Sequence, residues 1–387
     1  MNAFTRLGLT AGVTLAVTAV LAASASAASA ATTGPSHTGR GHVVAQNAVF
    51  VQTDGTAGNQ ILAYHRDQDG ALTQAGVYST GGLGGILQGS VVDHLASQGS
   101  LTYDARHGLL YAVNAGSDTV SVFAVDGDRL DLRQTVGSGG SFPVSVAVHG
   151  DVVYVLNALD GGSIQGYLVG DGRLIEVAGW HRSLGLDPTA TPQFTTTPGQ
   201  VGFSADGRQL LVTTKANTNS VEVFALGRFG APAATPVVNA LPGAVPFSFV
   251  LHGSNQILLT EAGPDAVATF TLDRDGILTQ TASAPTGQAA TCWIASAGDE
   301  IYAANAGSAS LSGFHTAADG SLTTVGVTST DPGAVDVAAT ADGRYLYAQT
   351  GGNGVLDELR VNADGSLTGI GSQTLPGAVG GEGVVAL

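Results

Sequence analysis

The chain contains almost no cysteine or lysine. Its 387 residues include one cysteine, Cys292, and one lysine, Lys215, and 14 basic against 30 acidic side chains give a formal charge of −16. A single cysteine excludes a disulfide scaffold. So few basic groups argue against nucleic acid or an anionic membrane surface as a partner. A hydrophobic content of 44% is too high for a disordered chain, so we expect a globular protein.

Long hydrophobic runs are absent beyond the N-terminus. The apolar run at 7–21 is shorter than the roughly 20 residues that span a bilayer. It follows Arg6 and precedes Ala-Ser-Ala patterns at 23–30, which is typical of a secretory signal peptide. We therefore predict a signal peptide at 1–30, a flexible leader at 31–42 and a single domain at 43–387. The mature protein is expected to be an extracellular monomer that binds a small-molecule substrate or another extracellular ligand.

The remainder of the chain is built from an internal repeat. An apolar strand that ends in a polar residue recurs seven times, as in Leu110 to Asn114 and Ile301 to Asn305, and a Gly-containing turn follows each copy. Six of these turns are Asp-Gly, which is a hairpin signal because glycine adopts positive φ without steric cost. Repeats of four short strands every 40 to 50 residues, on the order expected for propeller blades, predict an all-β propeller with four-stranded antiparallel blades.

The spacing of the repeats predicts seven blades and the way in which the ring closes. Six inner strands precede their blades in the sequence, and the seventh, at 381–387, ends the chain. This last strand is expected to pair beside 49–53 and so remove the open edges of the ring. Two insertions, at 81–98 and 181–198, fall in connections that should emerge on the same face as the ends of the second strands.

Common catalytic and metal-binding motifs are missing. The chain has no Gly-x-Ser-x-Gly, no His-Glu-x-x-His and no phosphate loop. The Asp-x-Asp-Gly strings at 67–70 and 273–276 are interpreted as hairpin turns, because neither carries the further ligands of a calcium loop. We expect no metal ion and no cofactor. Cys292 begins an inner strand and is expected to be buried and inert.

Polar residues at the ends of the second strands are the main candidates for a ligand site. They should surround one mouth of the central channel, where they could converge on one ligand; they are Asn114, Asn157, Lys215, Glu261, Asn305 and Gln349. The asparagines could instead terminate their strands by bonding local backbone. Lys215 and Glu261 could form an ion pair that is either structural or catalytic. His94 and His181 are the only histidines in the two insertions, where they either bind a ligand or are simply solvated.

The blades resemble those of a known family. The elements Leu110-Tyr111-Ala112, Asn114, 117–123 and Asp126-Gly127 are similar to those of the lactonase family of seven-bladed propellers, which includes 6-phosphogluconolactonases and carboxymuconate-lactonising enzymes. The resemblance covers residues 43–387. Catalytic members have a histidine where this chain has Gln200 and a Gly-Pro-Arg-His segment where it has 244–248, while Glu261 matches the glutamate of the family. The resemblance therefore implies that Glu261 is the catalytic acid or base and that Gln200 lines the same site.

Two functions follow from these observations. One is a secreted lactonase-like enzyme that hydrolyses or forms a small lactone at the channel mouth. The other is a non-catalytic extracellular propeller that presents its elaborated face to a partner, which would account directly for the missing histidine and arginine.

Overall fold

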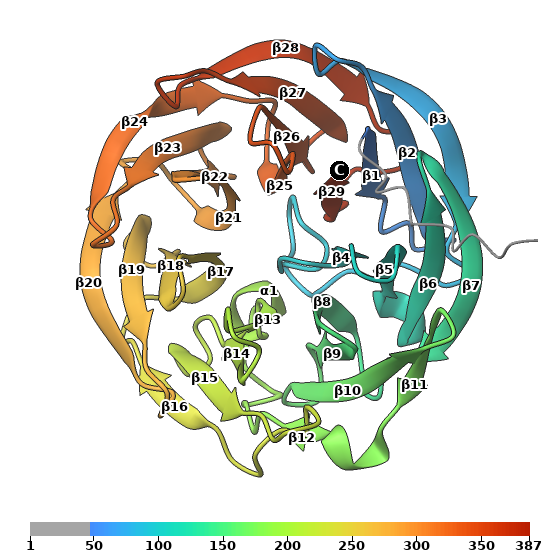
Figure 1. Cartoon of the computed structure of the whole chain (residues 1–387), viewed down its shortest axis with the longest axis vertical. Helices are drawn as coiled ribbons and strands as arrows, with labels where there is room; N and C mark the ends of the chain where they lie inside the picture. Colours follow the sequence, from blue (N-terminus) through green and yellow to red (C-terminus); the bar gives the residue numbers. More distant parts are fainter. Residues whose placement is uncertain (1–46) are drawn as a thin grey trace, which may run out of the picture. The chain divides into compact units, whose positions relative to one another are not determined.

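The computed structural model describes residues 47–387, which form seven four-stranded antiparallel blades around a central axis (Figure 1). The predicted signal peptide and leader lie outside the described residues. From the inside to the rim, blade 1 comprises β29 (Val384–Ala386), β1 (Ala48–Gln52), β2 (Gln60–Arg66) and β3 (Leu72–Ser79). Blade 2 comprises β4 (Leu101–Asp104), β5 (Leu109–Asn114), β6 (Thr119–Asp126) and β7 (Arg129–Gly137). Blade 3 comprises β8 (Pro143–His149), β9 (Val152–Asn157), β10 (Ser163–Gly170) and β11 (Arg173–Glu176), with β12 (Arg182–Ser183) also paired to β10.

The other four blades have the same order. Blade 4 comprises β13 (Val201–Phe203), β14 (Gln209–Thr213), β15 (Ser220–Ala225) and β16 (Val237–Ala240). Blade 5 comprises β17 (Pro246–His252), β18 (Gln256–Glu261), β19 (Ala266–Leu272) and β20 (Leu278–Pro285). Blade 6 comprises β21 (Thr291–Ala297), β22 (Glu300–Asn305), β23 (Ser310–Thr316) and β24 (Leu322–Ser329). Blade 7 comprises β25 (Ala334–Ala339), β26 (Tyr345–Thr350), β27 (Val355–Val361) and β28 (Leu367–Thr374).

The described helices are single turns. They are η1 (Ala115–Ser117), η2 (Ala178–Trp180) and α1 (Gln193–Thr196). None of the helices in residues 47–387 is long and apolar enough to cross a membrane.

The core lies between neighbouring blades. Between blades 1 and 2, for example, Phe50 and Ile61 pack with Leu110 and Phe123, and all four are at most 1% exposed. Middle strands such as β5 are buried along their whole length, whereas outer strands such as β3 are mostly exposed. This burial explains why the middle strands are apolar on both faces.

The ring closes as predicted. In β29, Val384, Val385 and Ala386 pair antiparallel with Val51, Phe50 and Val49 of β1. The paired part is shorter than the predicted strand at 381–387, and before and at its start Asp54 accepts the backbone N–H of Glu382 and Asp336 accepts that of Val384. One side chain from the loop after β1 and one from strand β25 therefore hold the start of the closing segment.

The hairpin turns also follow the sequence prediction. In the turn between β10 and β11, Asp171 and Gly172 both have positive φ, at 50° and 70°, as a two-residue hairpin turn requires. The second strand of blade 4 is shorter than expected. It ends at Thr213, because Lys215 adopts φ +48° and turns the chain out of the sheet.

Candidate functional site

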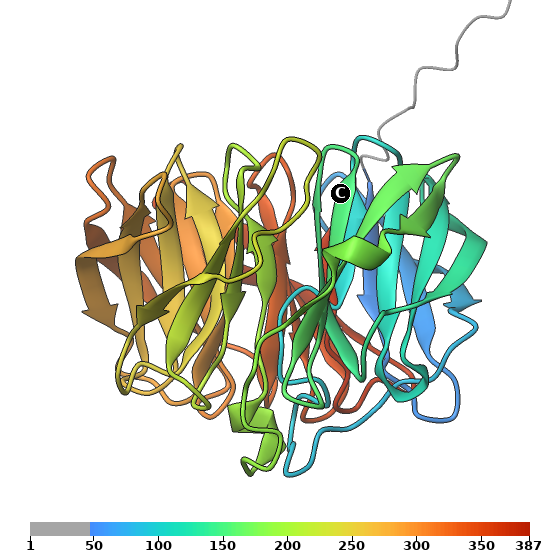
Figure 2. The same ribbon diagram turned by 90° about the horizontal axis from the view of Figure 1, so that it is seen from below.

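The two insertions lie on one face of the ring, as the repeat spacing predicted. We call this the insertion face, and Figure 2 shows helix α1 and the loop at 81–98 extending below the strands on this side. The first loop is bonded to hairpins at the ends of the second strands, through Gly84 N–H to Gly55 O (2.9 Å) and Gly116 N–H to Leu83 O (3.0 Å). The second loop is bonded to such a hairpin through Ala216 N–H to Thr195 O (2.9 Å).

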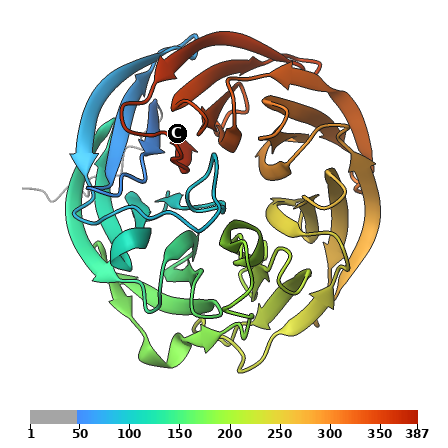
Figure 3. The same cartoon turned by 180° about the vertical axis from the view of Figure 1, so that it is seen from behind.

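The loop at 81–98 crosses the centre of the ring (Figure 3). The Gln98 amide exchanges two hydrogen bonds with the backbone of Ile294 on β21 (2.9 and 3.0 Å), and Trp293 Nε1 donates to Ser97 O (2.6 Å). The loop also packs on Gly351, where an added Cβ would lie 1.7 Å from Val92 O, so only glycine fits there. The insertion thus covers the channel mouth where sequence analysis placed the ligand.

Lys215 joins the two insertions. Its buried Nζ donates to Ala96 O (2.6 Å) in the first loop and to Phe194 O (2.8 Å) and Thr197 Oγ1 (3.1 Å) in the second. Burial lowers the pKa of Lys215 to about 7, and the nearby carboxylate of Asp93 opposes this change. The ion pair considered between Lys215 and Glu261 is not formed, because the amine turns inward to the loops, whose positions the sequence did not reveal.

Glu261 is the last residue of β18, where the sequence placed it. The backbone of Pro246 connects Glu261 to Lys215. Pro246 pairs with Glu261 across the sheet, and its carbonyl oxygen accepts a hydrogen bond from the Lys215 N–H (3.2 Å). The residue is 8% exposed, and burial raises the pKa of its carboxyl group. Within residues 47–387, none of the side-chain hydrogen bonds or ion pairs involves this carboxyl. The carboxyl of Glu261 is therefore left without a side-chain partner within the described residues, and its role in catalysis stays a prediction.

The three predicted asparagines are fully buried and bond within or beside their own blades. Asn114 donates to Ser121 Oγ (2.9 Å), Asn157 to Ser138 O (3.1 Å) and Asn305 to Ser312 Oγ (3.0 Å). The side-chain donors are thus directed along the blade rather than toward a common point. A role in binding stays a prediction for these residues.

The other predicted binding residues have varied surroundings. The Gln200 amide bridges blades 4 and 5 by two bonds to the backbone of Phe249 (2.6 and 3.2 Å), and buried Gln349 donates to Gln52 O (3.0 Å). His94, in the first loop, packs against Gly380, and burial lowers the pKa of the histidine. His181 follows η2 and is exposed. The structure therefore does not bring these residues together around Glu261.

A buried acidic cluster was missed by sequence analysis. We use the term acidic cluster for Asp54, Asp93, Asp336 and Glu382, each at most 4% exposed. Burial raises the pKa of Asp54 to about 8, of Asp336 to about 7 and of Asp93 to about 6, and it raises that of Glu382 as well. These residues come from four separate loops or strands, so no local motif marks them. No three His, Cys, Asp or Glu side chains of the described chain are arranged to hold a metal ion.

Cys292 is half-buried, less than the full burial that was expected, but its surroundings favour the protonated thiol. It is a free cysteine on β21, and burial raises its pKa to about 12, so the reactive thiolate is suppressed at neutral pH.

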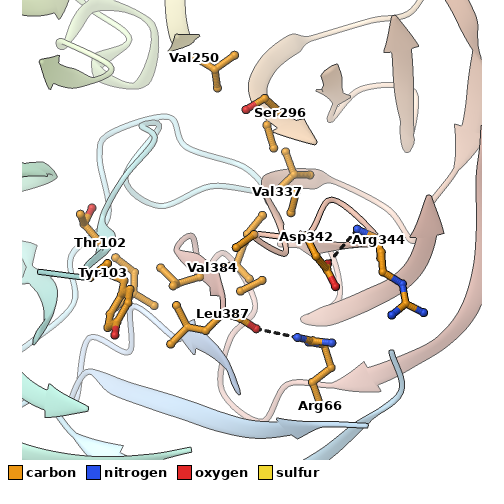
Figure 4. A pocket seen from close by; sticks show the side chains of 18 of the residues that line it. Arg66, Thr102, Tyr103, Val250, Ser296, Val337, Asp342, Arg344, Val384 and Leu387 are labelled. Atoms are coloured by element: carbon orange, nitrogen blue, oxygen red, sulfur yellow. Dashed lines mark hydrogen bonds between the residues drawn. The ribbon is translucent and has the colours of Figure 1, made fainter. Parts of the chain in front are cut away.

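A cavity of about 960 Å³ opens on the opposite face of the ring. It is walled by the ends of inner strands from blades 1, 2, 5, 6 and 7, and Figure 4 shows Val250, Ser296, Val337 and Val384 around it. Gln98 also lines the cavity, so the loop that covers the insertion face reaches its deep end. Glu261 lines none of the cavities described on this chain. The strand ends predicted to bind a ligand and the large cavity therefore lie on different faces of the ring.

Comparisons with known proteins agree with this architecture. The profile of the family described as "Lactonase, 7-bladed beta-propeller" matches residues 63–368. No protein among those with curated descriptions matches the chain.

Solved structures with the same fold share about a fifth of the sequence. A Bacteroides fragilis protein proposed to be a 6-phosphogluconolactonase is 21% identical, with a TM-score of 0.69 over 89% of this chain and 98% of the other. The periplasmic gluconolactonase of Pseudomonas aeruginosa is 19% identical, with a TM-score of 0.69 over 87% of this chain and 98% of the other. Such identities establish only the shared fold. The match to the family profile covers most of the chain and establishes the family. This chain belongs to the lactonase family of seven-bladed β-propellers.

Proposed function

We propose that this propeller opens the ring of a small, unphosphorylated lactone on its insertion face, with Glu261 as the proton-transfer group. The observation that carries the proposal is the Glu261 carboxyl, which stands at the glutamate position of the family, has no side-chain partner within residues 47–387 and has a raised pKa. The gluconolactonase and the proposed 6-phosphogluconolactonase with the same fold make a cyclic ester the natural substrate class to test.

The chemistry fits a carboxyl group in this environment. Hydrolysis of a lactone requires a proton to be removed from the attacking water and delivered to the leaving oxygen. Burial raises the pKa of Glu261 above its ordinary value, so the carboxyl holds a proton more readily than a free glutamate and is better suited to deliver it. General acid–base help is worth typically about 10² to 10⁴ in rate. Glu261 lies on the end of a strand in a rigid blade, which fixes its position.

The absence of arginine from the segment that pairs near Glu261 favours a substrate without a phosphate group. Phosphate groups are usually recognised by arginine forks or helix N-termini. The segment at 244–248, which pairs near Glu261, contains no arginine. Aldonolactones without phosphate are therefore the first compounds to test.

The experiment incubates the purified mature protein with a panel of lactones. Ring opening is followed by pH-stat, as the rate at which base must be added to hold the pH. We expect glucono-δ-lactone or a related sugar lactone to be opened faster than in buffer. Glu261→Gln keeps the shape of the side chain and should lower kcat by about 10² or more. Glu176→Gln, which changes an exposed glutamate on the outer strand β11, is the matched control and should retain wild-type activity. Undiminished activity in Glu261→Gln would contradict the proposal.

We also propose that the protein is exported, because the N-terminal segment has the pattern of a signal peptide. One of the proteins with the same fold is periplasmic.

The second candidate function is non-catalytic ligand binding. It is favoured by the cavity of about 960 Å³ on the face away from Glu261. A protein with no activity on any lactone, but with a ligand in this cavity, would support binding in place of catalysis.

A further inference from the structure

We propose that the cavity on the face opposite the insertions is a binding site for a small carboxylate with an apolar body. The geometry that supports this is a blind funnel with apolar side chains on its walls and an exposed arginine and a tyrosine hydroxyl near its mouth. This site is separate from Glu261 and does not depend on the lactonase proposal.

The funnel is blind because the insertion at 81–98 closes its deep end. The two bonds between the Gln98 amide and Ile294, together with the bond from Trp293 to Ser97, tie that loop to blade 6 across the channel. A closed end turns an axial channel into a pocket. Its volume of about 960 Å³ lies in the range of roughly 300 to 1,000 Å³ that is usual for small-molecule sites.

The walls are apolar and preformed. Val250, Ala338 and Val385 line the funnel and are partly exposed, and they belong to the inner strands of blades 5, 7 and 1. Because these strands are held by their own sheets, the pocket needs little rearrangement to accept an apolar group. Burying such a group there removes apolar surface from water, which favours binding.

The rim carries the polar contacts. Charged side chains that line the cavity are Arg66, Asp342 and Arg344 (Figure 4), and both guanidinium groups lie over the ring of Tyr345. Arg66 is 8% exposed and its Nη2 donates to Leu387 O (3.0 Å), so it is held by the closing segment and Arg344 is the exposed cation of the rim. Arg344 is exposed, and one of its guanidinium nitrogens lies 3.4 Å from the Tyr345 hydroxyl, a weak contact.

Tyr103 adds a further polar group from blade 2. Its side chain lines the cavity, and its hydroxyl takes part in none of the side-chain hydrogen bonds in the described chain. Arginine and a phenolic hydroxyl are both donors suited to a carboxylate. The funnel therefore combines an apolar interior with anion-binding groups at its mouth, which is the arrangement that an amphipathic monocarboxylate needs.

The test is isothermal titration calorimetry of the mature protein at 150 mM salt with three probes, 1-naphthylacetate, cyclohexylacetate and octanoate. We expect at least one of them to bind, and we expect the neutral isostere of the best, for example 1-naphthylacetamide, to bind about tenfold more weakly because it loses the charge-assisted bonds. No binding by any of the three acids up to about 10 mM, the weak end of measurable affinity, would overturn the proposal. Equal affinity for the acid and the amide would also overturn it.

Variants locate the site. Ser296 is exposed on β21 and points into the funnel, so Ser296→Trp should fill the cavity and abolish binding. Ser372→Trp, on the exposed outer strand β28, is its control and should bind normally. Arg344→Gln should raise the Kd about five- to tenfold, whereas Arg133→Gln on the outer strand β7 should not.

A further variant separates this site from the catalytic proposal. Glu261→Gln should leave carboxylate binding unchanged, so loss of lactonase activity and loss of this site are distinguishable. Unchanged affinity in a Ser296→Trp protein with wild-type Tm would show that the probe binds elsewhere and would overturn the assignment.

Discussion

Removal of the closing strand at 381–387 should destabilise the propeller severely. The segment takes part in at least seven hydrogen bonds outside itself: Gln52 N–H to Gly383 O, Leu387 N–H to Ala48 O, Glu382 N–H to Asp54, Val384 N–H to Asp336, Ser100 Oγ to Glu382 O, Ser97 Oγ to Glu382 Oε2 and Arg66 Nη2 to Leu387 O. At about 0.5 to 1.5 kcal/mol net for each bond, their loss is worth roughly 4 to 10 kcal/mol. That is comparable to the whole stability of a typical domain, about 5 to 15 kcal/mol.

Two further effects add to this loss. Val384 is 5% exposed, and its removal uncovers the apolar inner edge of β1. Asp54 and Asp336 would lose backbone donors while remaining largely buried, and a buried group without its partner costs about 1 to 3 kcal/mol. We therefore expect the truncated protein either to be insoluble or to have a Tm lowered by roughly 10 °C or more.

The assay is differential scanning calorimetry of the full and truncated proteins. A synthetic peptide Gly-Glu-Gly-Val-Val-Ala-Leu added in excess should restore part of the lost Tm, because it can pair with β1 as a donated strand. A peptide of the same composition in scrambled order is the control. A Tm that is unchanged by the truncation, or rescue by the scrambled peptide, would refute the reasoning.

Three other predictions concern stability, the inserted loops and processing. Burial raises the pKa of Asp54 to about 8 and of Asp336 to about 7, above the ordinary 3.8. The folded protein therefore holds the protons of these two carboxyl groups more tightly than the unfolded chain does. The stability that this difference contributes is fully present below about pH 4 and is lost as the pH rises through 7 to 8. The free energy of unfolding by urea should thus fall between pH 5 and 7, and less steeply in Asp54→Asn; a rise over this range would contradict the assignment. Lys215→Met removes the donor to Ala96, Phe194 and Thr197 and should speed hydrogen exchange and proteolysis in both insertions, with little change in β19 as the internal control; equal protection in both proteins would show that Lys215 does not hold the loops. Intact-mass analysis of exported protein should show cleavage near Ala30 and no disulfide through Cys292, and retention of residues 1–25 would count against a signal peptide.

Local sequence patterns were sufficient to predict the fold. Seven Gly-containing turns and seven apolar strands that end in polar residues specify hairpins, and hairpin formation depends on neighbouring residues alone. The closing strand could be predicted by counting inner strands, and the face of the two insertions followed from their position in the repeat. Glu261 at the end of β18 was likewise placed correctly, because strand ends are part of the repeat.

The surroundings of the functional groups were decided only by the tertiary structure. The position of Lys215 in the repeat was known, but its partners lie about 20 and 120 residues away in loops that have no repeat to fix their path. The acidic cluster, the closure of one channel mouth by Gln98 and the open cavity with Arg66 and Arg344 likewise combine residues from distant blades. Regular strands are specified by period and turn chemistry, whereas the path of an irregular loop depends on long-range contacts formed once the ring has assembled. For this reason the sequence alone determined the scaffold of the protein, and only the folded ring decided which of its faces is covered and which is open.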